Sequence, residues 1–277
     1  TMNNIDQDTV DSFGNEWERF DQSGMTENEV LKISKDYFDI FPWEKLGTDS
    51  TGFDMGCGSG RWAQYVAPKV GHLNCIDPSS AISIAKKKLR NFNNVTFIHG
   101  SVSSNSLTKS SQDFGYSLGV LHHVPDTQAA IESCVDLLKP GAPLLLYLYY
   151  DFENRTKLFY LMWKASNFFR KVISKMPQFM KNIVTDIIAI IIYLPLSLTA
   201  RFVDKCRLNS TNIPLSYYKD KSFYTMRTDS RDRFGTPLEQ RFSRSKIHKM
   251  MSNAGIKGIT FSKSPPFWCV VGFKEGK

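Results

Sequence analysis

The sequence predicts an α/β fold, with a doubly wound, mostly parallel seven-stranded sheet and a helical cap inserted after strand five. Between residues 50 and 150, short apolar runs of strand length alternate with helical patterns, as expected when helices connect parallel strands. Residues 142–150 form a continuous apolar run, which is typical of a strand covered on both faces. A helix and two strand patterns return over 243–274, after a long stretch of different character.

The elements follow one another in a regular order along the chain. Ser79 or Ser80 is expected to cap the second helix of the α/β part. The run Lys86-Lys87-Lys88 lies near the C-terminal end of that helix, where the helix dipole favours cations. The expected strands are 52–55, 72–77, 95–99, 114–118, 142–150, 256–262 and 267–273, and the expected helices are 61–67, about 80–89, 127–138 and 243–253.

The chain length of 277 residues fits one large domain with an insertion. We expect an N-terminal helical segment over 1–45, a core formed by 46–150 together with 243–277, and a basic, aromatic-rich insertion over 151–242. The insertion looks helical over 155–207 and loop-like over 208–242. Its apolar run Ile187–Leu196 is much shorter than the roughly 20 residues that a membrane-spanning helix requires, and it predicts no such helix.

The net charge of +8 is confined to one stretch of the insertion. Residues 155–207 contain ten Lys or Arg and two Asp, and the rest of the chain is neutral overall. With Phe168, Phe169, Met176, Phe179 and the Ile-rich run, this stretch suits an interfacial surface near anionic lipid head groups. Such a surface predicts salt-sensitive vesicle binding that is lost when Lys171, Lys175 and Lys181 are neutralised. In the alternative interpretation, the Ile-rich run is the inner helix of a cap and the charges form its solvated face. Tyr and Arg residues intermix between Tyr217 and Arg244, which gives nucleic acid as a third interpretation, but no RNA-binding module is recognisable.

Composition and cysteine usage exclude several classes of protein. Apolar residues make up 42% and charged residues 22% of the chain, so it is neither disordered nor low in complexity. The five scattered cysteines show no CxxC spacing, which predicts neither a disulfide framework nor a metal site. The polar N-terminus has no apolar signal region. We therefore expect a cytoplasmic protein. In the interfacial interpretation, it would also associate with a membrane through residues 155–207.

A glycine-rich turn follows the first strand, and it is the motif in this sequence that most clearly indicates a ligand-binding site. It reads Asp54-Met55-Gly56-Cys57-Gly58-Ser59-Gly60, and Asp77 ends the next strand 21 residues after Gly56. Glycines there let the backbone turn sharply and let a ligand approach a helix N-terminus. An acidic residue at this distance is placed to accept hydrogen bonds from ribose hydroxyls. The pattern predicts a nucleotide-type ligand at the end of the first two strands.

The glycines fall as G-x-G-x-G with an acidic residue two positions ahead, rather than as the G-x-G-x-x-G of dinucleotide-binding proteins. This resembles motif I of the class I S-adenosylmethionine (AdoMet)-dependent methyltransferases, which have a Rossmann-like fold. The stretches Gly119–Val124 and Leu137–Gly141 are similar to the small-molecule branch that includes quinone and sterol methyltransferases. The resemblance covers residues about 50–150 and 243–274, and it implies AdoMet as the cofactor.

The resemblance also implies a role for individual residues. Asp54 and the turn backbone would hold the methionine moiety, Asp77 would bind the ribose, and Leu118 and Gly119 would lie beside the transferred methyl. Residues 13–17, ending at Trp17, resemble the N-terminal segment that closes over the cofactor in related enzymes; the alternative is that Phe13 and Trp17 are ordinary packing residues on one helical face. Ser101 and Val102 would line the adenine ring. Ser101 departs from the family, which usually has an acidic residue there to accept from the adenine amino group, so we expect weaker cofactor binding. The complete set of expected cofactor-binding residues is Trp17, Asp54, Gly56, Cys57, Gly58, Arg61, Asp77, Pro78, Ser79, Ser101, Val102, Leu118 and Gly119.

A hydroxyl acceptor needs a general base, and histidines are suited to this role at neutral pH. His122 and His123 follow the fourth strand, where ligands of open α/β sheets bind; Tyr217 and Glu239 are further candidates near the acceptor. We expect transfer of a methyl group to a hydroxyl or amine of a small-molecule or lipid- or glycan-linked acceptor. The alternatives are a non-catalytic AdoMet-binding partner or regulatory protein, and an RNA methyltransferase. Neither the acceptor nor an oligomeric state follows from the sequence.

Overall fold

The computed structural model describes residues 4–21, 24–153, 157–211 and 213–276, so Arg155 of the basic stretch lies outside the described residues. The chain divides into two compact units. The first, which we call the α/β unit, comprises Thr1–Asp21, Val30–Glu153 and Leu238–Lys277. The second, the helical unit, comprises Gln22–Glu29 and Asn154–Pro237.

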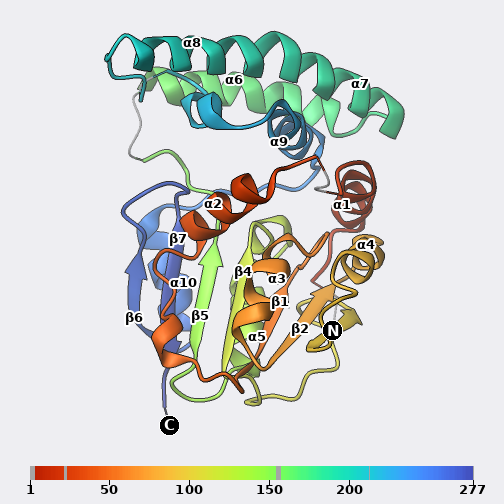
Figure 1. Cartoon of the computed structure of the whole chain (residues 1–277), viewed down its shortest axis with the longest axis vertical. Helices are drawn as coiled ribbons and strands as arrows, with labels where there is room; N and C mark the ends of the chain where they lie inside the picture. The colour runs from red at the N-terminus through yellow and green to blue at the C-terminus, as the bar shows by residue number, and fades with distance from the viewer. Residues whose placement is uncertain (1–3, 22–23, 154–156, 212, 277) are drawn as a thin grey trace. The chain divides into compact units, whose positions relative to one another are not determined.

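The α/β unit is built on the predicted seven-stranded sheet, with its strands in the order β3-β2-β1-β4-β5-β7-β6 (Figure 1). All neighbouring strands are parallel except where β7 pairs with β5 and β6. The strands are shorter than predicted at several ends, since residues 148–150 and 267–268 lie outside the regular ladder. Their bounds are β1 Thr51–Met55, β2 His72–Asp77, β3 Val95–His99, β4 Phe114–Leu118, β5 Pro143–Tyr147, β6 Ile256–Phe261 and β7 Cys269–Lys274.

Helices cover both faces of this sheet (Figure 1). Helices α5 and α10 pack against each other on one face, where Ile131, Ile247 and Met251 enter a buried cluster with the strands. Helices α3 and α4 lie on the other face. The helices of the α/β unit, and α2 which continues into it, are α1 Gln7–Arg19, α2 Glu27–Tyr37, α3 Arg61–Val66, α4 Ala81–Lys88, α5 Thr127–Leu137 and α10 Arg244–Asn253, with short 3-10 turns η1 Trp43–Lys45, η2 Ala67–Lys69 and η3 Leu121–His123.

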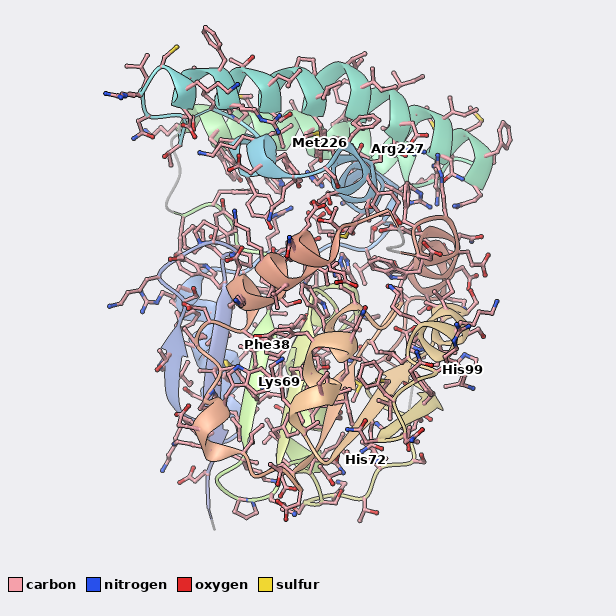
Figure 2. All side chains as sticks on the ribbon, viewed as in Figure 1. Phe38, Lys69, His72, His99, Met226 and Arg227 are labelled. Atoms are coloured by element: carbon pink, nitrogen blue, oxygen red, sulfur yellow. The ribbon has the colours of Figure 1, made fainter. Side chains whose placement is uncertain are left out.

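An aromatic cluster anchors the segment after α2 to the sheet. Phe38, labelled in Figure 2, is buried, and its ring lies 5.2 Å from that of Tyr116 on β4. It also contacts Trp43 and Tyr65 at 5.6 and 5.5 Å. Aromatic pairs at such spacings add to the free energy of burial. The segment after α2 is therefore fixed within the α/β unit by packing.

The order of the strands indicates where a ligand would bind on the sheet. β1 lies between β2 and β4, and the chain leaves β1 towards β2 but later crosses back to β4. Ligands of open α/β sheets bind outside the carboxyl ends of strands at such a switch point. The segments at that edge are the glycine-rich turn after β1, Asp77 at the end of β2, and Leu118 and Gly119 at the end of β4.

The helical unit contains one long helix that the sequence did not predict at full length. Helices α7 Gln178–Ile188 and α8 Leu194–Lys205 are joined without a break by the π-helical segment η4 Ala189–Tyr193. Proline normally interrupts a helix, but Pro195 lies in the first turn of α8, directly after the π-helical segment, and such local unwinding accommodates missing hydrogen bonds. The result is a helix of 28 residues, Gln178–Lys205, that is long and apolar enough to cross a membrane by length and composition. The prediction of a run too short for this is therefore wrong.

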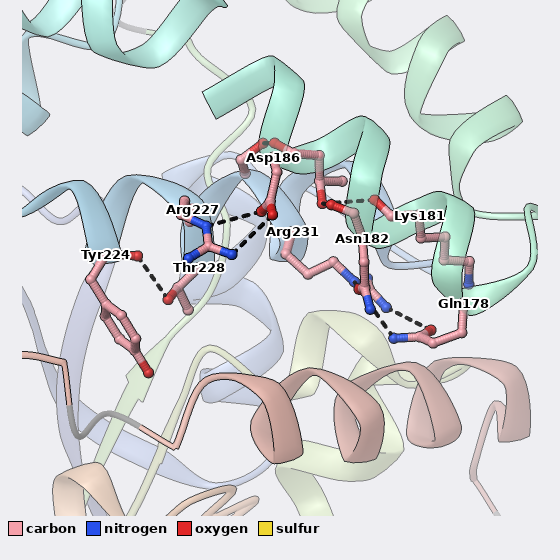
Figure 3. Close-up of polar contacts among 10 residues, drawn as sticks. Gln178, Lys181, Asn182, Asp186, Tyr224, Arg227, Thr228 and Arg231 are labelled. Atoms are coloured by element: carbon pink, nitrogen blue, oxygen red, sulfur yellow. Dashed lines mark hydrogen bonds and ion pairs between the residues drawn. The ribbon is translucent and has the colours of Figure 1, made fainter. Parts of the chain in front are cut away.

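The expectation of a loop over 208–242 is also wrong. The helical unit contains α6 Lys157–Ile173, the turn η5 Ser216–Asp220 and a 13-residue helix, α9 Phe223–Gly235. Helix α9 begins with a Ser222 cap, whose hydroxyl accepts from the backbone N–H of Thr225 at 3.2 Å. Its sequence shows no apolar stripe, because several of its buried contacts are polar. Arg227 pairs with Asp186 of α7 at 2.9 Å, and the fully buried Arg231 donates to Gln178 at 3.0 Å (Figure 3).

Candidate functional site

The glycine-rich turn is held beside the end of β2. Gly56, Gly58 and Gly60 have φ values of +81°, +51° and +78°, a region that favours glycine. The N–H groups of Gly56 and Cys57 donate to the carbonyl of Ile76, at 2.8 and 3.0 Å. The Cys57 thiol is buried, which raises its pKa well above its usual value. It is a small packing residue of the turn, and its high pKa disfavours a nucleophilic thiolate.

Asp77 connects this turn to the start of α4. Its Oδ2 accepts from the N–H of Gly58 at 2.8 Å, and its Oδ1 accepts from the N–H and hydroxyl of Ser79 at 2.9 and 2.5 Å. Burial raises the pKa of Asp77, and the hydrogen bonds from Ser79 and Gly58 oppose that rise. A carboxylate offers about four acceptor positions. Asp77 therefore retains capacity for a ligand's hydroxyl groups while it orders the turn.

Asp54 carries a buried carboxyl group near the carboxyl end of β1, beside the glycine-rich turn. It lies near the end of β1 with no exposed surface, and neither of its oxygens accepts a hydrogen bond from the described residues. Burial raises its pKa to about 8. The hydroxyl of Tyr116 opposes the rise without reaching hydrogen-bond geometry, and Asp77 adds to it. A buried polar group of this kind calls for a partner, and a cationic donor would satisfy it best.

Helix α1 covers the turn. A Cβ atom on Gly58 would lie 3.1 Å from Nε1 of Trp17, so the indole lies directly against the turn. The Arg61 guanidinium at the start of α3 is 5.9 Å from the Trp17 ring and 4.2 Å from the Trp62 ring. The structure thus brings Trp17 against Gly58 and Arg61, although Trp17 is far from both in the sequence.

The residues after β2 and β3 form the neighbouring side of the site. The carbonyl of Pro78 lies 2.8 Å from Nε2 of His99, and the N–H of Gly100 donates to the carbonyl of Asp77 at 3.2 Å. The hydroxyl of Ser101 is buried and accepts from the N–H of Ser104 at 3.1 Å. Val102 is buried in the core cluster. Ser101 therefore lies close to Asp77, with its hydroxyl engaged in a local turn.

The histidine pair lies after β4, next to Leu118 and Gly119. Gly119 has φ +81° and donates its N–H to the carbonyl of Tyr147 at 3.1 Å. His122 is fully buried, stacks on Tyr149 at 3.8 Å, and has no hydrogen-bond partner for either ring nitrogen among the described residues. Burial, together with His123 and Arg241, lowers the pKa of His122 well below its usual value. The ring is therefore neutral at physiological pH and able to accept a hydrogen bond.

His123 and Glu239 have other partners. Nδ1 of His123 lies 2.6 Å from the carbonyl of Leu238, so this nitrogen carries the proton. Glu239 is almost fully buried and accepts from Nε of Arg241 at 2.8 Å. The Arg241 guanidinium lies 4.9 Å from the Tyr149 ring. Glu239 thus holds Arg241 beside the ring that stacks on His122, and its charge is balanced by that arginine.

Tyr217, the remaining candidate, belongs to the helical unit. It lies on η5 and is 40% exposed, and its ring contacts that of Tyr218 at 5.3 Å. Tyr147 and Tyr149 were missed as site residues. The available signal was their alternate spacing at the end of a strand, which places two side chains on one face.

Comparisons with known proteins agree with this geometry. Residues 53–146 match the model of a methyltransferase domain family. Phosphoethanolamine N-methyltransferase 2 of Caenorhabditis elegans is 29% identical over 126 residues, which are 44% of this chain and 28% of the relative. Ubiquinone biosynthesis O-methyltransferase of Serratia proteamaculans is 27% identical over 117 residues, 41% of this chain and 47% of the relative. The matches therefore span less than half of each curated relative.

A solved structure extends the likeness along the chain. A SAM-dependent methyltransferase from Methanosarcina mazei superposes with a TM-score of 0.52 at 17% identity. The superposition covers 86% of this chain and 99% of the other. At this identity the likeness concerns the fold, and it agrees with the doubly wound sheet of the α/β unit.

Proposed function

We propose that this chain is a class I AdoMet-dependent methyltransferase that transfers a methyl group to a hydroxyl or amine of a small-molecule or lipid- or glycan-linked acceptor. The observation that carries the proposal is His122, a buried and neutral imidazole at the end of β4 whose nitrogens find no hydrogen-bond partner among the described residues. Buried polar atoms such as these ring nitrogens normally have a hydrogen-bond partner. An acceptor hydroxyl or amine is a partner of the right chemistry, and it would lie next to Gly119.

The residues at the switch point fit the cofactor. The buried carboxyl of Asp54 suits an ammonium group, and Asp77 suits ribose hydroxyls. When bound, AdoMet supplies an electrophilic methyl group on a sulfonium. Methyl transfer then breaks the S–CH₃ bond, leaves the electron pair on sulfur, and forms a bond from carbon to the acceptor oxygen or nitrogen.

The protein's own contribution is to position the acceptor and receive its proton. His122 accepts a hydrogen bond from the acceptor and then its proton, which passes on to solvent after the transfer. The depressed pKa of the ring disfavours a long-lived imidazolium. Tyr147 and Tyr149 pack around the imidazole at 6.4 and 3.8 Å and exclude water from it. Alignment of the reacting atoms can lower the barrier by about 7–11 kcal/mol in favourable cases.

The test uses AdoMet labelled in its methyl group, with the purified protein and an extract of its source cells. We expect label in small molecules of the aqueous phase or in lipids of the organic phase. The Asp77→Ala variant is the matched control and should transfer none. Label in nuclease-sensitive, acid-precipitable material would identify an RNA methyltransferase instead. AdoMet binding without transfer of label would support the non-catalytic alternative.

Ser101 gives a separate prediction on the cofactor site. Ser101→Asp should tighten AdoMet binding about tenfold, because a carboxylate accepts a stronger hydrogen bond than a hydroxyl, by about 1–2 kcal/mol. Aspartate can also keep the turn bond to the Ser104 N–H. Isothermal titration of AdoMet measures the change, with Ser103→Asp as the control on the same turn. Unchanged or weaker binding by Ser101→Asp would place the adenine elsewhere.

A further inference from the structure

Helix α7-η4-α8, residues Gln178–Lys205, exposes most of its large apolar side chains, unlike a helix on the surface of a water-soluble protein. Its buried residues are small or polar, and Val184, Ile188 and Leu194 are partly buried, whereas most of its large aliphatic and aromatic side chains are exposed. A helix at a protein surface normally buries its apolar stripe and exposes its polar face. The buried set is Lys181, Thr185, Ala189, Tyr193, Ser197 and Ala200, and the exposed set is Phe179, Met180, Ile183, Ile187, Ile190, Ile191, Ile192, Leu198 and Phe202.

The buried side of this helix is fixed by its contacts with α9. Ser230 donates its hydroxyl to the carbonyl of Thr185 at 2.8 Å, and Arg227 pairs with Asp186 (Figure 3). Tyr193 packs in a small buried cluster with Met226. The exposed aliphatic side is therefore directed away from α9 and is not available to fill the core of the helical unit.

Helix α6 shows a second amphipathic face, on which apolar and basic residues are combined. Its inner side contacts α9 and the residues just after that helix: Arg170 donates to the carbonyl of Thr236 at 2.9 Å, and Ile173 packs with Met226 and Phe234. At 100° per residue, the side opposite these contacts carries Leu161, Phe168 and Val172, which are 61%, 66% and 49% exposed. The same side carries Lys157, Lys164 and Lys171, and Lys175 follows in the turn after the helix; all four are exposed.

The exposed sides of α6 and α7-η4-α8 are together called the outer face. Basic residues continue it at the end of α8, where Arg201, Lys205 and Arg207 are exposed. Asp204 is the acidic residue in that part, and it is paired with Lys219. Exposed apolar side chains bordered by basic residues fit an anionic membrane surface, because lysine stems reach along apolar material while their charges meet the head groups.

We propose that the outer face binds an anionic lipid bilayer in the plane of its interface. Binding by insertion across the bilayer conflicts with α9, whose Arg227, Arg231 and Arg233 pack along the inner side of the same helices. Charged groups of that kind are costly in hydrocarbon. A second copy of the chain is disfavoured as the occupant, because a two-fold contact would place the same lysine stripe on both sides.

Two residues expected at the membrane surface do not belong to the outer face. Lys181 was predicted among the membrane-facing basic residues, but it is 8% exposed and lies on the buried side of its helix. Met176 is also partly buried, against the small cluster of the helical unit. The charge test therefore uses Lys164, Lys171 and Lys175.

The experiment is flotation of the full chain with vesicles of phosphatidylcholine, alone or with about 30% phosphatidylglycerol. We expect flotation with the anionic vesicles and its loss in high salt. The double change Ile187→Glu and Ile191→Glu should lower the bound fraction at least about tenfold. Lys164→Gln, Lys171→Gln and Lys175→Gln together should weaken binding to anionic vesicles on the order of 100-fold, at about 1 kcal/mol per lysine.

Matched controls test whether a loss of vesicle binding comes from unfolding or from non-specific binding to vesicles. Leu31→Glu changes a 43% exposed leucine of α2, and Lys86→Gln, Lys87→Gln and Lys263→Gln change three exposed lysines of the α/β unit. All variants should keep the wild-type melting curve and AdoMet affinity, which reports on the α/β unit and is independent of vesicle binding.

Four outcomes would overturn the proposal. The first is a wild-type chain that does not float, and the second is a Leu31→Glu control that loses binding as strongly as the outer-face variant. The third is a stable dimer that becomes a monomer on Ile191→Glu, which would identify a second copy as the occupant. The fourth is resistance of the native membrane-bound protein to alkaline carbonate extraction, which would identify a spanning helix. None of these results depends on whether the chain transfers methyl groups.

Discussion

AdoMet is expected to bind about 50-fold more tightly at pH 8 than at pH 6, because Asp54 must lose a proton to accept the cofactor's ammonium. In the free protein, burial raises the pKa of Asp54 to about 8, so the carboxyl is protonated below that pH. An ammonium partner lowers this pKa, and binding below pH 8 therefore releases about one proton. Affinity rises about tenfold per pH unit as a result. Titration calorimetry in buffers of different ionisation enthalpy measures the released proton directly.

Asp54→Asn should remove this pH dependence and weaken binding at pH 8 about 100-fold, which corresponds to loss of a buried charge-assisted pair. The matched control is Asp136→Asn, which removes an exposed carboxylate paired with Lys109. Asp77, Tyr116 and the buried thiols of Cys57 and Cys75 also face this region, but the Asp54 variant separates its proton from theirs. If the variant keeps both affinity and pH dependence, the ammonium is held elsewhere.

The same carboxyl predicts an opposite effect on the stability of the free protein. A folded-state pKa raised above the unfolded value means that folding retains a proton, so stability declines as pH rises from about 4 to about 8. Asp54→Asn removes that penalty. The free variant should be more stable than wild type at pH 7 by about 2–4 kcal/mol, and thermal melting at several pH values measures this. A less stable variant would mean that Asp54 is already paired in the free protein.

Sequence patterns predicted the α/β unit well because its elements have distinct periods and clear breaks. Alternation of strand and helix patterns identified all seven strands, and G-x-G-x-G with Asp77 identified the switch-point edge. The site residues near the turn come from adjacent strand ends, where parallel pairing brings carboxyl ends to one edge. Trp17 and Gly58 are close because α1 packs over the turn, a contact that the resemblance implied but periodicity alone cannot specify.

The helical unit was less predictable, for identifiable physical reasons. Helix α9 carries no apolar stripe, because its contacts with α7 are polar: the partly exposed Arg227 pairs with Asp186, and the buried Arg231 donates to Asn182 and Gln178 (Figure 3). The long helix continues past Pro195, which sequence rules treat as a break. The buried position of Lys181 also depends on where the helix meets α9. Each of these features is set by tertiary contacts that local sequence does not encode.

His122→Gln is expected to lower the initial rate of methyl transfer by about 10²–10³ without changing AdoMet affinity, because it removes the proton acceptor but leaves the glycine-rich turn intact. The acceptor pool for this assay is the labelled fraction obtained from the cell extract. The matched control is His72→Gln, at the far end of β2, where the ring contacts Thr96 (Figure 2). It should transfer label at the wild-type rate.

The pH profile separates a proton acceptor from a packed ring. Burial, His123 and Arg241 hold the pKa of His122 well below 6.5, so its ring stays neutral and the wild-type rate should not fall between pH 8 and pH 6.5 through protonation of this residue. A lowered folded-state pKa also means that stability is lost as pH falls below about 6.5, since the unfolded chain binds the proton more tightly. His122→Gln should remove that acid sensitivity. A variant that becomes acid-resistant yet transfers label at the wild-type rate would assign His122 to packing and leave the acceptor's proton to another group.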